Sequence, residues 1–286
     1  MLQIDFSHAD APLAAENRSF RPVFAEKTQS VPALERGLSI LECLSKSKCG
    51  LTLTQLAAQL ELPKSSVHCL LLTFERHDYL YRDARSGRYR LGLRLCDLAD
   101  AALSGCALRD QAMPYLNQLR DATQLTCHMA VLEQEEVVLI AKAEGLGSRV
   151  NTWLGKRMDI HCTALGKSLA AYLPADELET LVRRRGMLRH NDNTIASLKK
   201  LKEELERVRR LGYSIDDEEE EIGTRCIGVP VLHTEYHPVA AISLSGTTSQ
   251  INDANVDPLI AELKIKAAAI AQVSKPNRNG NGAAGR

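Results

Sequence analysis

Polar residues at the start of one predicted helix have the chemistry needed to contact a duplex nucleic acid. The helix begins after Leu62-Pro63, because proline is tolerated where the first N–H of a helix has no partner. Its first turns carry a lysine, two hydroxyls, an imidazole and a thiol: Lys64, Ser65, Ser66, His68 and Cys69. Such side chains can contact phosphates or base edges, since the first turn of a recognition helix enters the major groove most deeply.

A basic ribbon is predicted directly after this helix. Residues 79–82 and 88–91 have the pattern of two short strands, joined by a turn at 83–87. Four arginines along it would lie against backbone phosphates: Arg82, Arg85, Arg88 and Arg90. Because arginines alternate with tyrosines and leucine along the strands, we expect the charge on one face of the ribbon. The alternatives are a solvated ribbon without a ligand and a module that docks another protein.

A second set of polar residues lies towards the C-terminal end. Along 238–245, strand alternation places Ser243 and Ser245 on one face, opposite three apolar side chains. Cys226 opens a neighbouring predicted strand, and Thr163 begins a helix whose N-terminal N–H groups favour an anion. Together these residues would form a pocket for a small carboxylate. Serines that face solvent and a buried, inert thiol are an equal alternative.

No motif in the sequence predicts catalysis. The chain lacks G-x-S-x-G, H-E-x-x-H and a Walker loop, and Gly145-Leu146-Gly147 does not extend to G-x-G-x-x-G. A thiol–imidazole pair of Cys226 with His128 or His161 is conceivable, but no spacing requires it. The acidic run 216–221 could bind a metal ion, although a solvated loop is the simpler interpretation. Eight cysteines without zinc-ligand spacing indicate free, mostly buried thiols. Taken together, the missing motifs and this cysteine pattern lead us to expect no enzyme, no metal and no cofactor.

The elements that position the first set form a helix-turn-helix. Apolar residues at helical spacing predict a helix over 31–45. Thr52 with Gln55 makes a capping box that starts the next helix, and Thr52 is included among the DNA-contacting residues. The helix after it has a core stripe at helical spacing, which consists of Val67, Leu70, Leu71 and Phe74. This helix must end at Asp78, a residue type that tolerates a left-handed backbone.

The rest of the chain alternates helices with hairpins. A connecting helix is expected at about 93–104. It is followed by helices at 108–122, 163–172, 174–185, 196–211 and 257–273, and by strands at 126–132, 137–144, 226–232 and 238–245. This order implies an α+β fold with an antiparallel sheet. Trp153, the single tryptophan, is either a pocket wall or part of the core.

Composition and charge suit a protein that binds nucleic acid with one part only. The 286 residues are 44% apolar and 25% charged, and the net charge is zero. Residues 46–92 nevertheless carry eight Lys or Arg against four Asp or Glu. No signal-peptide pattern opens the chain and no apolar run approaches the ~20 residues that span a bilayer, so we expect a cytoplasmic protein without membrane contact.

With these residues in view, the chain from Val31 to about Val273 resembles the isocitrate-lyase-regulator (IclR-type) family of bacterial transcription factors. Four stretches carry the resemblance: 62–68, 87–92, 161–167 and the segment from Gly212 onward. The last is the most specific, with Gly212, Asp216, Glu219, Cys226, Ile227, Gly228 and Val231 at the family's intervals. Cys69 stands where the family usually has Arg, so the operator is expected to differ from the common one.

The resemblance implies a winged helix-turn-helix joined by a linker helix to a GAF-like effector domain. The expected parts are a mobile arm (1–30), the DNA-binding domain (31–92), the linker helix (93–107), the effector domain (108–274) and a disordered tail (275–286). Carried over position by position, the effector-binding residues are Ala164, Leu165, Asp216, Cys226, Ser243 and Ser245. Homodimers, often paired into tetramers, would bind a palindromic double-stranded operator.

These observations predict a transcriptional regulator whose operator affinity is controlled by a small effector, a small carboxylate or an aromatic acid. The expected mechanism is linkage, in which the effector favours one arrangement of the two recognition helices. Two alternatives stand beside it. One is a metabolic enzyme or sensor that uses its first domain for assembly, and the other is a DNA-binding regulator with a vestigial pocket.

Overall fold

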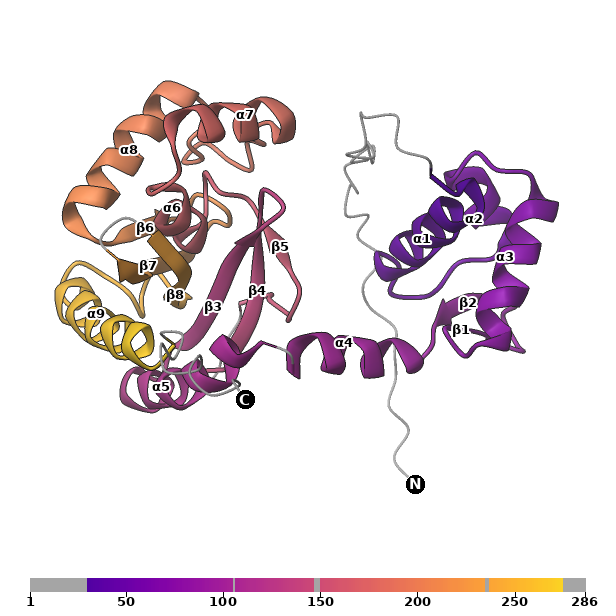
Figure 1. Ribbon diagram of the computed structural model, residues 1–286, viewed down its shortest axis with the longest axis horizontal. Helices are drawn as coiled ribbons and strands as arrows, with labels where there is room; N and C mark the ends of the chain where they lie inside the picture. The colour runs from indigo at the N-terminus through magenta and orange to yellow at the C-terminus, as the bar shows by residue number, and fades with distance from the viewer. Residues whose placement is uncertain (1–29, 105, 147–149, 235–236, 275–286) are drawn as a thin grey trace, which may run out of the picture. The chain divides into compact units, whose positions relative to one another are not determined.

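The computed structural model describes residues 30–104, 106–146, 150–234 and 237–274 (Figure 1). These residues form two compact units, with the boundary between Asp97 and Leu98. The expected tail at 275–286 lies outside the described residues, as does the expected arm at 1–30 except for Ser30. Within the described ranges, no helix is both long enough and apolar enough to cross a bilayer.

The first unit packs helices against a small antiparallel ribbon. Its elements are α1 (Pro32–Ser45), α2 (Leu53–Gln59), α3 (Lys64–Arg76), β1 (Leu80–Arg82) and β2 (Tyr89–Leu91). One apolar cluster joins all of them, including Ile40, Leu56, Leu71, Leu80 and Tyr89. This order of helices and ribbon is that of a winged helix-turn-helix.

Local sequence signals explain where α2 begins and α3 ends. The predicted capping box is confirmed: Gln55 N donates to Thr52 Oγ1 at 3.3 Å, and Thr52 N donates to Gln55 Oε1 at 2.9 Å. Asp78 has a φ of 60°, so the predicted left-handed residue after α3 is also confirmed. Val67 and Leu71 are fully buried, while Leu70 and Phe74 pack against the same cluster from its edge.

The helix α4 (Arg94–Ser104) follows the ribbon, close to its predicted position. The boundary between the two units falls inside it, after Asp97. From Arg94 to Ala102 nearly every side chain is exposed, apolar Leu98 included.

The second unit is built on one antiparallel sheet in the order β5-β4-β3-β8-β7-β6. Its strands are β3 (Thr126–Glu133), β4 (Glu136–Ala143), β5 (Arg157–Met158), β6 (Ser214–Asp217), β7 (Thr224–Thr234) and β8 (His237–Thr247). Its helices are α5 (Ala107–Thr123), α6 (Ala164–Ala170), α7 (Ala175–Arg185), α8 (Leu198–Leu211) and α9 (Val256–Val273). The α+β architecture is as predicted, but β5 and β6 were not expected from the sequence.

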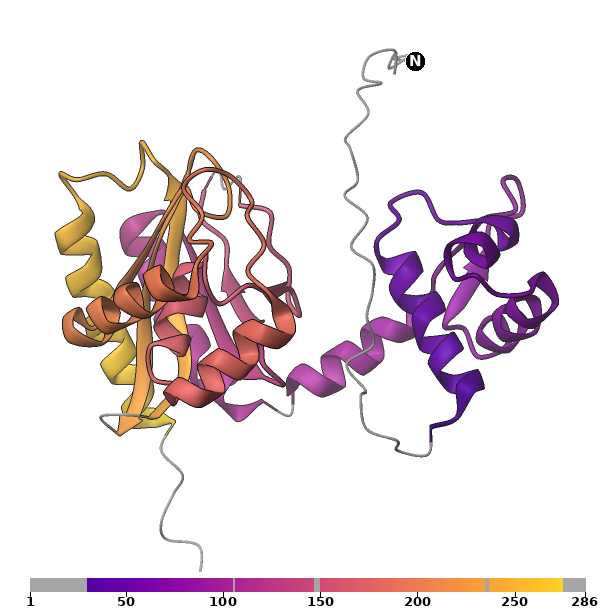
Figure 2. The ribbon, with the colours of Figure 1, turned by 90° about the horizontal axis from the view of Figure 1, so that it is seen from above.

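The two faces of this sheet are covered by different helices. α5 and α9 pack on one face, where Ile242 and Leu244 of β8 lie in the core; α9 is yellow in Figures 1 and 2. α6, α7 and α8 pack on the other face, against Ala241 of β8 and Ala130 of β3. The alternation predicted for β8 therefore holds, and Ser243 and Ser245 lie on the second face.

Candidate DNA-contacting face and effector pocket

The polar residues predicted on α3 lie on its outer side. Lys64, Ser65, His68 and Cys69 are exposed, and Ser66 is half-buried. They occupy the face away from Val67 and Leu71, which anchor the helix to the core. The arrangement leaves the first two turns of α3 accessible to a duplex.

Two of the predicted DNA-contacting residues are engaged within the protein. The hydroxyl of Thr52 takes part in the capping box of α2. Arg88 is half-buried, and its Nη1 donates to the carbonyl of Gly50 at 2.9 Å and to Gln55 Oε1 at 3.2 Å. Both residues therefore fix the start of α2 against the ribbon.

The ribbon does not carry its charge on one face, so that prediction is wrong. The antiparallel register pairs Arg82 with Tyr89 and Tyr81 with Arg90. Directly paired residues point to the same face, which places Arg82 beside buried Tyr89 and Arg90 on the opposite side. The guanidinium of Arg82 lies 5.7 Å from the Tyr89 ring centroid. Arg82, Arg85 and Arg90 are nevertheless all exposed.

In the second unit, strand register brings the predicted pocket residues side by side. One cross-strand row runs Asp216, Cys226, Ser245 and Thr126, and the next runs Ser214, Gly228, Ser243 and His128. All six predicted effector-binding residues line the same cavity, with about 510 Å³ of empty space that includes its opening to solvent. The sequence prediction of one polar pocket on this face therefore agrees with the geometry.

A close approach between α6 and β7 forms the inner wall of this pocket. A Cβ at Gly228 would lie 2.5 Å from the carbonyl oxygen of Ala164, so only glycine lets the helix start here. Thr163 caps α6: its Oγ1 accepts from Gly166 N at 3.0 Å and donates to the carbonyl of Asp159 at 2.7 Å. Ala164 and Leu165 then reach the cavity.

His128 also lines the cavity, and the sequence analysis did not select it as a binding residue. It is buried; its Nε2 lies 2.8 Å from Thr152 Oγ1 and its Nδ1 lies 3.3 Å from Ser245 Oγ. Burial, with Lys142 and Lys156 nearby, lowers the pKa of His128 to about 3, so the ring is neutral at physiological pH. Strand parity across β3 and β8 was the signal that could have found it.

The geometry does not support a thiol–imidazole pair. The partners of His128 are Thr152 and Ser245, and His161 Nε2 lies 2.9 Å from the carbonyl of Leu188. Burial and the charge of Asp216 raise the pKa of Cys226 well above its ordinary value, so the thiol stays protonated. The eight cysteines, all within the described ranges, are unpaired as predicted. Two of these cysteines (Cys127 and Cys162) are fully buried, three including Cys226 are half-buried and three are exposed, so the expectation of mostly buried thiols is wrong.

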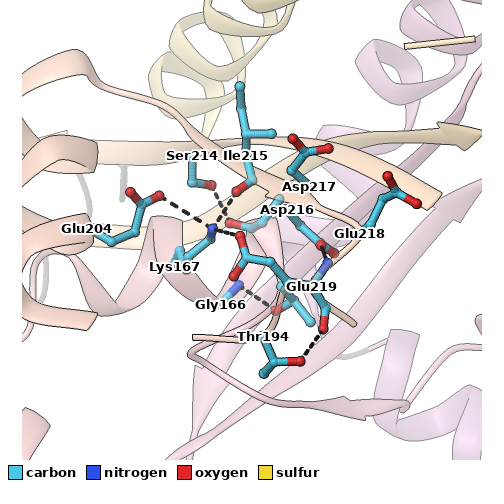
Figure 3. Close-up of polar contacts among 12 residues, drawn as sticks. Gly166, Lys167, Thr194, Glu204, Ser214, Ile215, Asp216, Asp217, Glu218 and Glu219 are labelled. Atoms are coloured by element: carbon cyan, nitrogen blue, oxygen red, sulfur yellow. Dashed lines mark hydrogen bonds and ion pairs between the residues drawn. The ribbon is translucent and has the colours of Figure 1, made fainter. Parts of the chain in front are cut away.

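The acidic run is not a solvated loop, which corrects another prediction. Asp216 is 3% exposed and Glu219 is 7% exposed. A carboxylate oxygen of Glu219 lies 2.5 Å from Nζ of buried Lys167, which also donates to the carbonyl of Ile215 and lies 3.4 Å from Glu204 (Figure 3). Lys167 supplies the compensating charge that lets this segment enter the protein.

Asp216 contacts the buried Glu219, the partner of Lys167, and also lines the pocket. Its carboxylate accepts a hydrogen bond from Glu219 N at 2.9 Å, as Figure 3 shows, and it lines the cavity. Burial raises the pKa of Asp216 to about 7, and the neighbouring Glu219 and Glu220 act in the same direction. A carboxyl group in this state can donate a hydrogen bond as well as accept one.

A lysine lies at the rim of the pocket. Lys156 Nζ is 3.3 Å from Glu220 Oε1 and 5.7 Å from the centroid of the Trp153 ring. Trp153 is 57% exposed, so it belongs to neither the core nor the pocket wall. Lys156 gives the rim a positive charge beside the carboxylates of the acidic run.

Comparison with known proteins matches both units to models of one protein family. The family model described as the IclR helix-turn-helix domain matches residues 33–84. The model described as the bacterial transcriptional regulator IclR C-terminal matches residues 100–272. The two matches together span most of the described chain.

Relatives with known roles cover most of this chain. The HTH-type transcriptional regulator XynR of Escherichia coli is 34% identical over 227 residues, which are 79% of this chain and 90% of that protein. The transcriptional repressor IclR of Escherichia coli is 32% identical over 263 residues, 90% of this chain and 95% of that protein. These two relatives are a regulator and a repressor of transcription.

Solved structures share the fold. The IclR protein of Thermotoga maritima superposes with a TM-score of 0.69 at 29% identity, over 84% of this chain and 97% of that one. An IclR homologue of Microbacterium hydrocarbonoxydans, solved in complex with 4-hydroxybenzoate, gives 0.71 at 24% identity over 84% of this chain and 98% of that one. The protein is thus a DNA-binding transcriptional regulator. The chain belongs to the IclR family of bacterial transcriptional regulators.

Proposed function

We propose that this regulator binds a double-stranded operator in the cytoplasm as a homodimer or a dimer of dimers, and that a small acid in the β6–β8 pocket controls this binding. The observation that carries the proposal is the cavity itself. Ala164, Leu165, Asp216, Cys226, Ser243 and Ser245 converge on it from four separate elements or loops. A vestigial pocket would not be expected to keep this many polar groups converging on one space.

DNA contact is assigned to the exposed polar residues of the first unit. Ser65, His68 and Cys69 would meet base edges, while Lys64 and Ser66 would meet phosphates. Arg82, Arg85 and Arg90 would bind the backbone from the ribbon. Thr52 and Arg88 would act by holding the start of α2 and the ribbon in place.

The pocket suits a small carboxylate or an aromatic acid. The hydroxyls of Ser243 and Ser245 can donate to a carboxylate, as can Asp216 when protonated. Lys156 at the rim contributes the positive charge. Met158 and Leu165 add apolar surface for a ring or a short chain. The 4-hydroxybenzoate held by the Microbacterium homologue belongs to the same chemical class.

Exposed apolar surface on α1 supports the proposed homodimer. Leu34 is 62% exposed and Leu38 is 51% exposed, and they lie four residues apart, with Val31 on the same side. A second copy of this face would cover these side chains and place two copies of α3 on a palindromic operator. Effector binding would then favour one arrangement of the dimer over another, and change operator affinity by linkage.

Binding of full-length protein to DNA tests the proposal. Fluorescence anisotropy should show tighter binding to a duplex from upstream of its own gene than to a scrambled duplex, and affinity should fall as salt rises. Equal affinity for both duplexes at low salt would overturn the DNA assignment. In a thermal-shift screen, at least one small carboxylate or aromatic acid should raise the melting temperature and alter operator affinity. If no acid does either, the vestigial-pocket alternative is correct.

Light scattering tests the assembly. Wild-type protein should have at least the mass of a dimer, and Leu34→Glu with Leu38→Glu should reduce it to a monomer that binds the operator weakly. Leu211→Glu, at an exposed position on α8, is the matched control and should leave the mass unchanged. A monomeric wild-type protein that still discriminates its operator would contradict the dimer.

A further inference from the structure

A cluster of metal-ligating side chains lies outside the effector pocket. Asp159 and Cys162 belong to the segment between β5 and α6, and His190 belongs to the segment between α7 and α8. One ligand atom from each of these residues lies within 4.8 Å of the others. None of the three residues lines the effector cavity. Sequence spacing gave no sign of this cluster, because 28 positions separate His190 from Cys162.

From this geometry we propose that Asp159, Cys162 and His190 form a binding site for a divalent transition-metal ion of the zinc class. Carboxylate oxygen, thiolate sulfur and imidazole nitrogen are all ligands of Zn²⁺, a borderline-soft ion. Ligand atoms of a tetrahedral zinc site are about 3.4–3.8 Å apart, so small side-chain rotations would close the cluster around an ion. Water would fill the fourth position.

The surroundings of the cluster are held in place. His190 Nε2 lies 3.1 Å from Asp159 Oδ2, and the ring of His161 stacks on that of His190 with centroids 6.5 Å apart. His161 is fixed in turn by its contact with the carbonyl of Leu188. The carbonyl of Asp159 accepts from Thr163 Oγ1 at 2.7 Å. Supporting contacts of this kind orient ligands and strengthen metal binding.

Charge and access also fit a cation. Cys162 is fully buried, whereas Asp159 and His190 are partly open to solvent, so an ion can enter from one side. Carboxylates of Asp159, Glu220, Asp216 and Glu219 act on the Cys162 sulfur. Burial, and after it these carboxylates, raise the pKa of the Cys162 thiol, whereas the same negative charges favour a doubly charged cation. On binding, the Cys162 thiol loses one proton to solvent as the sulfur–metal bond forms, and no group is oxidised or reduced.

The site would join two segments, one next to the effector pocket and one that binds the backbone of the acidic run. Cys162 is followed directly by Thr163, Ala164 and Leu165, which line the effector pocket. His190 is followed by Asn191 and Thr194, which bind the backbone of Glu218 and Glu219. An ion at this site would therefore restrain the wall of the pocket without occupying it. The proposal stands on these three ligands and does not depend on which effector binds.

Cobalt titration of tag-free, chelator-treated full-length protein tests the site. One equivalent of Co²⁺ should produce a near-ultraviolet thiolate-to-metal charge-transfer band with visible bands typical of tetrahedral cobalt, and Zn²⁺ should abolish both. Cys162→Ser should remove the charge-transfer band, and His190→Gln should weaken Zn²⁺ binding by about tenfold or more. Cys226→Ser, in the effector pocket, is the matched control and should keep the band.

Several results would overturn the proposal. These are the absence of the band in wild-type protein, its survival in Cys162→Ser, and its loss in Cys226→Ser alone, which would place the ion in the effector pocket. If Cys162→Ser does not fold, partly exposed His190→Gln remains decisive, because unchanged Zn²⁺ affinity in that variant contradicts the site. Operator binding can be measured on the same samples, so failure of the metal site and failure of the regulator function are separable.

Discussion

The ammonium of Lys167 on α6 lies 2.5 Å from a carboxylate oxygen of Glu219 in the segment between β6 and β7, and both side chains are almost fully buried (Figure 3). The second carboxylate oxygen of Glu219 has no hydrogen-bond partner among the described residues. Lys167 thus supplies most of the positive charge that compensates the buried carboxylate of Glu219 next to the pocket.

Replacing this lysine should therefore destabilise the second unit strongly. Lys167→Met leaves Glu219 uncompensated, and we expect a loss of about 3–5 kcal/mol in the free energy of unfolding. Urea denaturation followed by circular dichroism measures it. The double variant with Glu219→Gln should recover part of the loss, since the isolated charge is gone. A single-variant loss below about 1 kcal/mol would show that the pair is not a structural requirement.

Arg90 in β2 and Arg88, which directly precedes this strand, should respond differently to truncation. Arg90→Ala should weaken binding to all DNA sequences alike and lower the slope of log affinity against log salt by about 1, because one phosphate contact is lost. Arg88→Ala should instead lower the melting temperature of the first unit, since the carbonyl of Gly50 loses its partner. Anisotropy titrations and thermal scans of both variants separate the roles. Equal effects in both assays would contradict the division.

Specific recognition should depend on the outer face of α3. Ser65→Ala with His68→Ala removes polar groups that can meet base edges, so the preference for the operator over scrambled DNA should fall by tenfold or more. Non-specific binding at low salt should persist. Thr73→Ala on the same helix, where the hydroxyl donates to the carbonyl of Cys69, serves as control. Retained discrimination in the double variant would exclude α3 as the reading element.

Asp216 should make stability depend on pH. Its pKa is about 7 in the folded protein because of burial, against an ordinary value of 3.8, so the folded state holds more protons than the unfolded state between these values. Unfolding free energy should therefore fall as pH rises from about 4 to 7, by up to roughly 1.4 kcal/mol per pH unit. Asp216→Asn cannot ionise and should lose this contribution. Urea midpoints of both proteins at pH 5 and pH 8 measure it. If the midpoint changes equally with pH in the wild type and in Asp216→Asn, the prediction for Asp216 is wrong.

Ser243 should affect the effector response and leave DNA binding intact. Ser243→Ala removes a buried hydroxyl from the cavity, and the concentration of an effective acid needed to change operator affinity should rise by about tenfold. Ser249→Ala, in the exposed turn after β8, is the control. Loss of operator binding in the absence of any effector would indicate that Ser243 is structural.

Local signals in the sequence were sufficient where neighbouring residues decide the structure. The capping box of Thr52 and Gln55, the left-handed Asp78 and the alternation around Ser243 each depend on contacts within a few residues or on strand parity. The position of the pocket followed from that parity and from the family pattern. None of these needed knowledge of distant parts of the chain.

Features that depend on long-range contacts could not be predicted in this way. Glu219 is buried only because Lys167, more than fifty residues earlier, lies against it. The face of Arg82 depends on the register with Tyr89, which alternation along a single strand does not specify. The cluster of Asp159, Cys162 and His190 arises where two loops meet. β5 and β6 are too short to show a period of their own.

The contact between Gly228 and the carbonyl of Ala164 has a consequence for how this protein can evolve. No side chain fits at position 228, so the inner wall of the pocket is closed to substitution at that point. A change of effector has to arise at other positions that line the cavity, such as Thr152, Lys156 and Glu221. Mutations at these positions can alter ligand preference while the packing of α6 on β7 stays intact. Related proteins can therefore keep this fold and respond to different effectors.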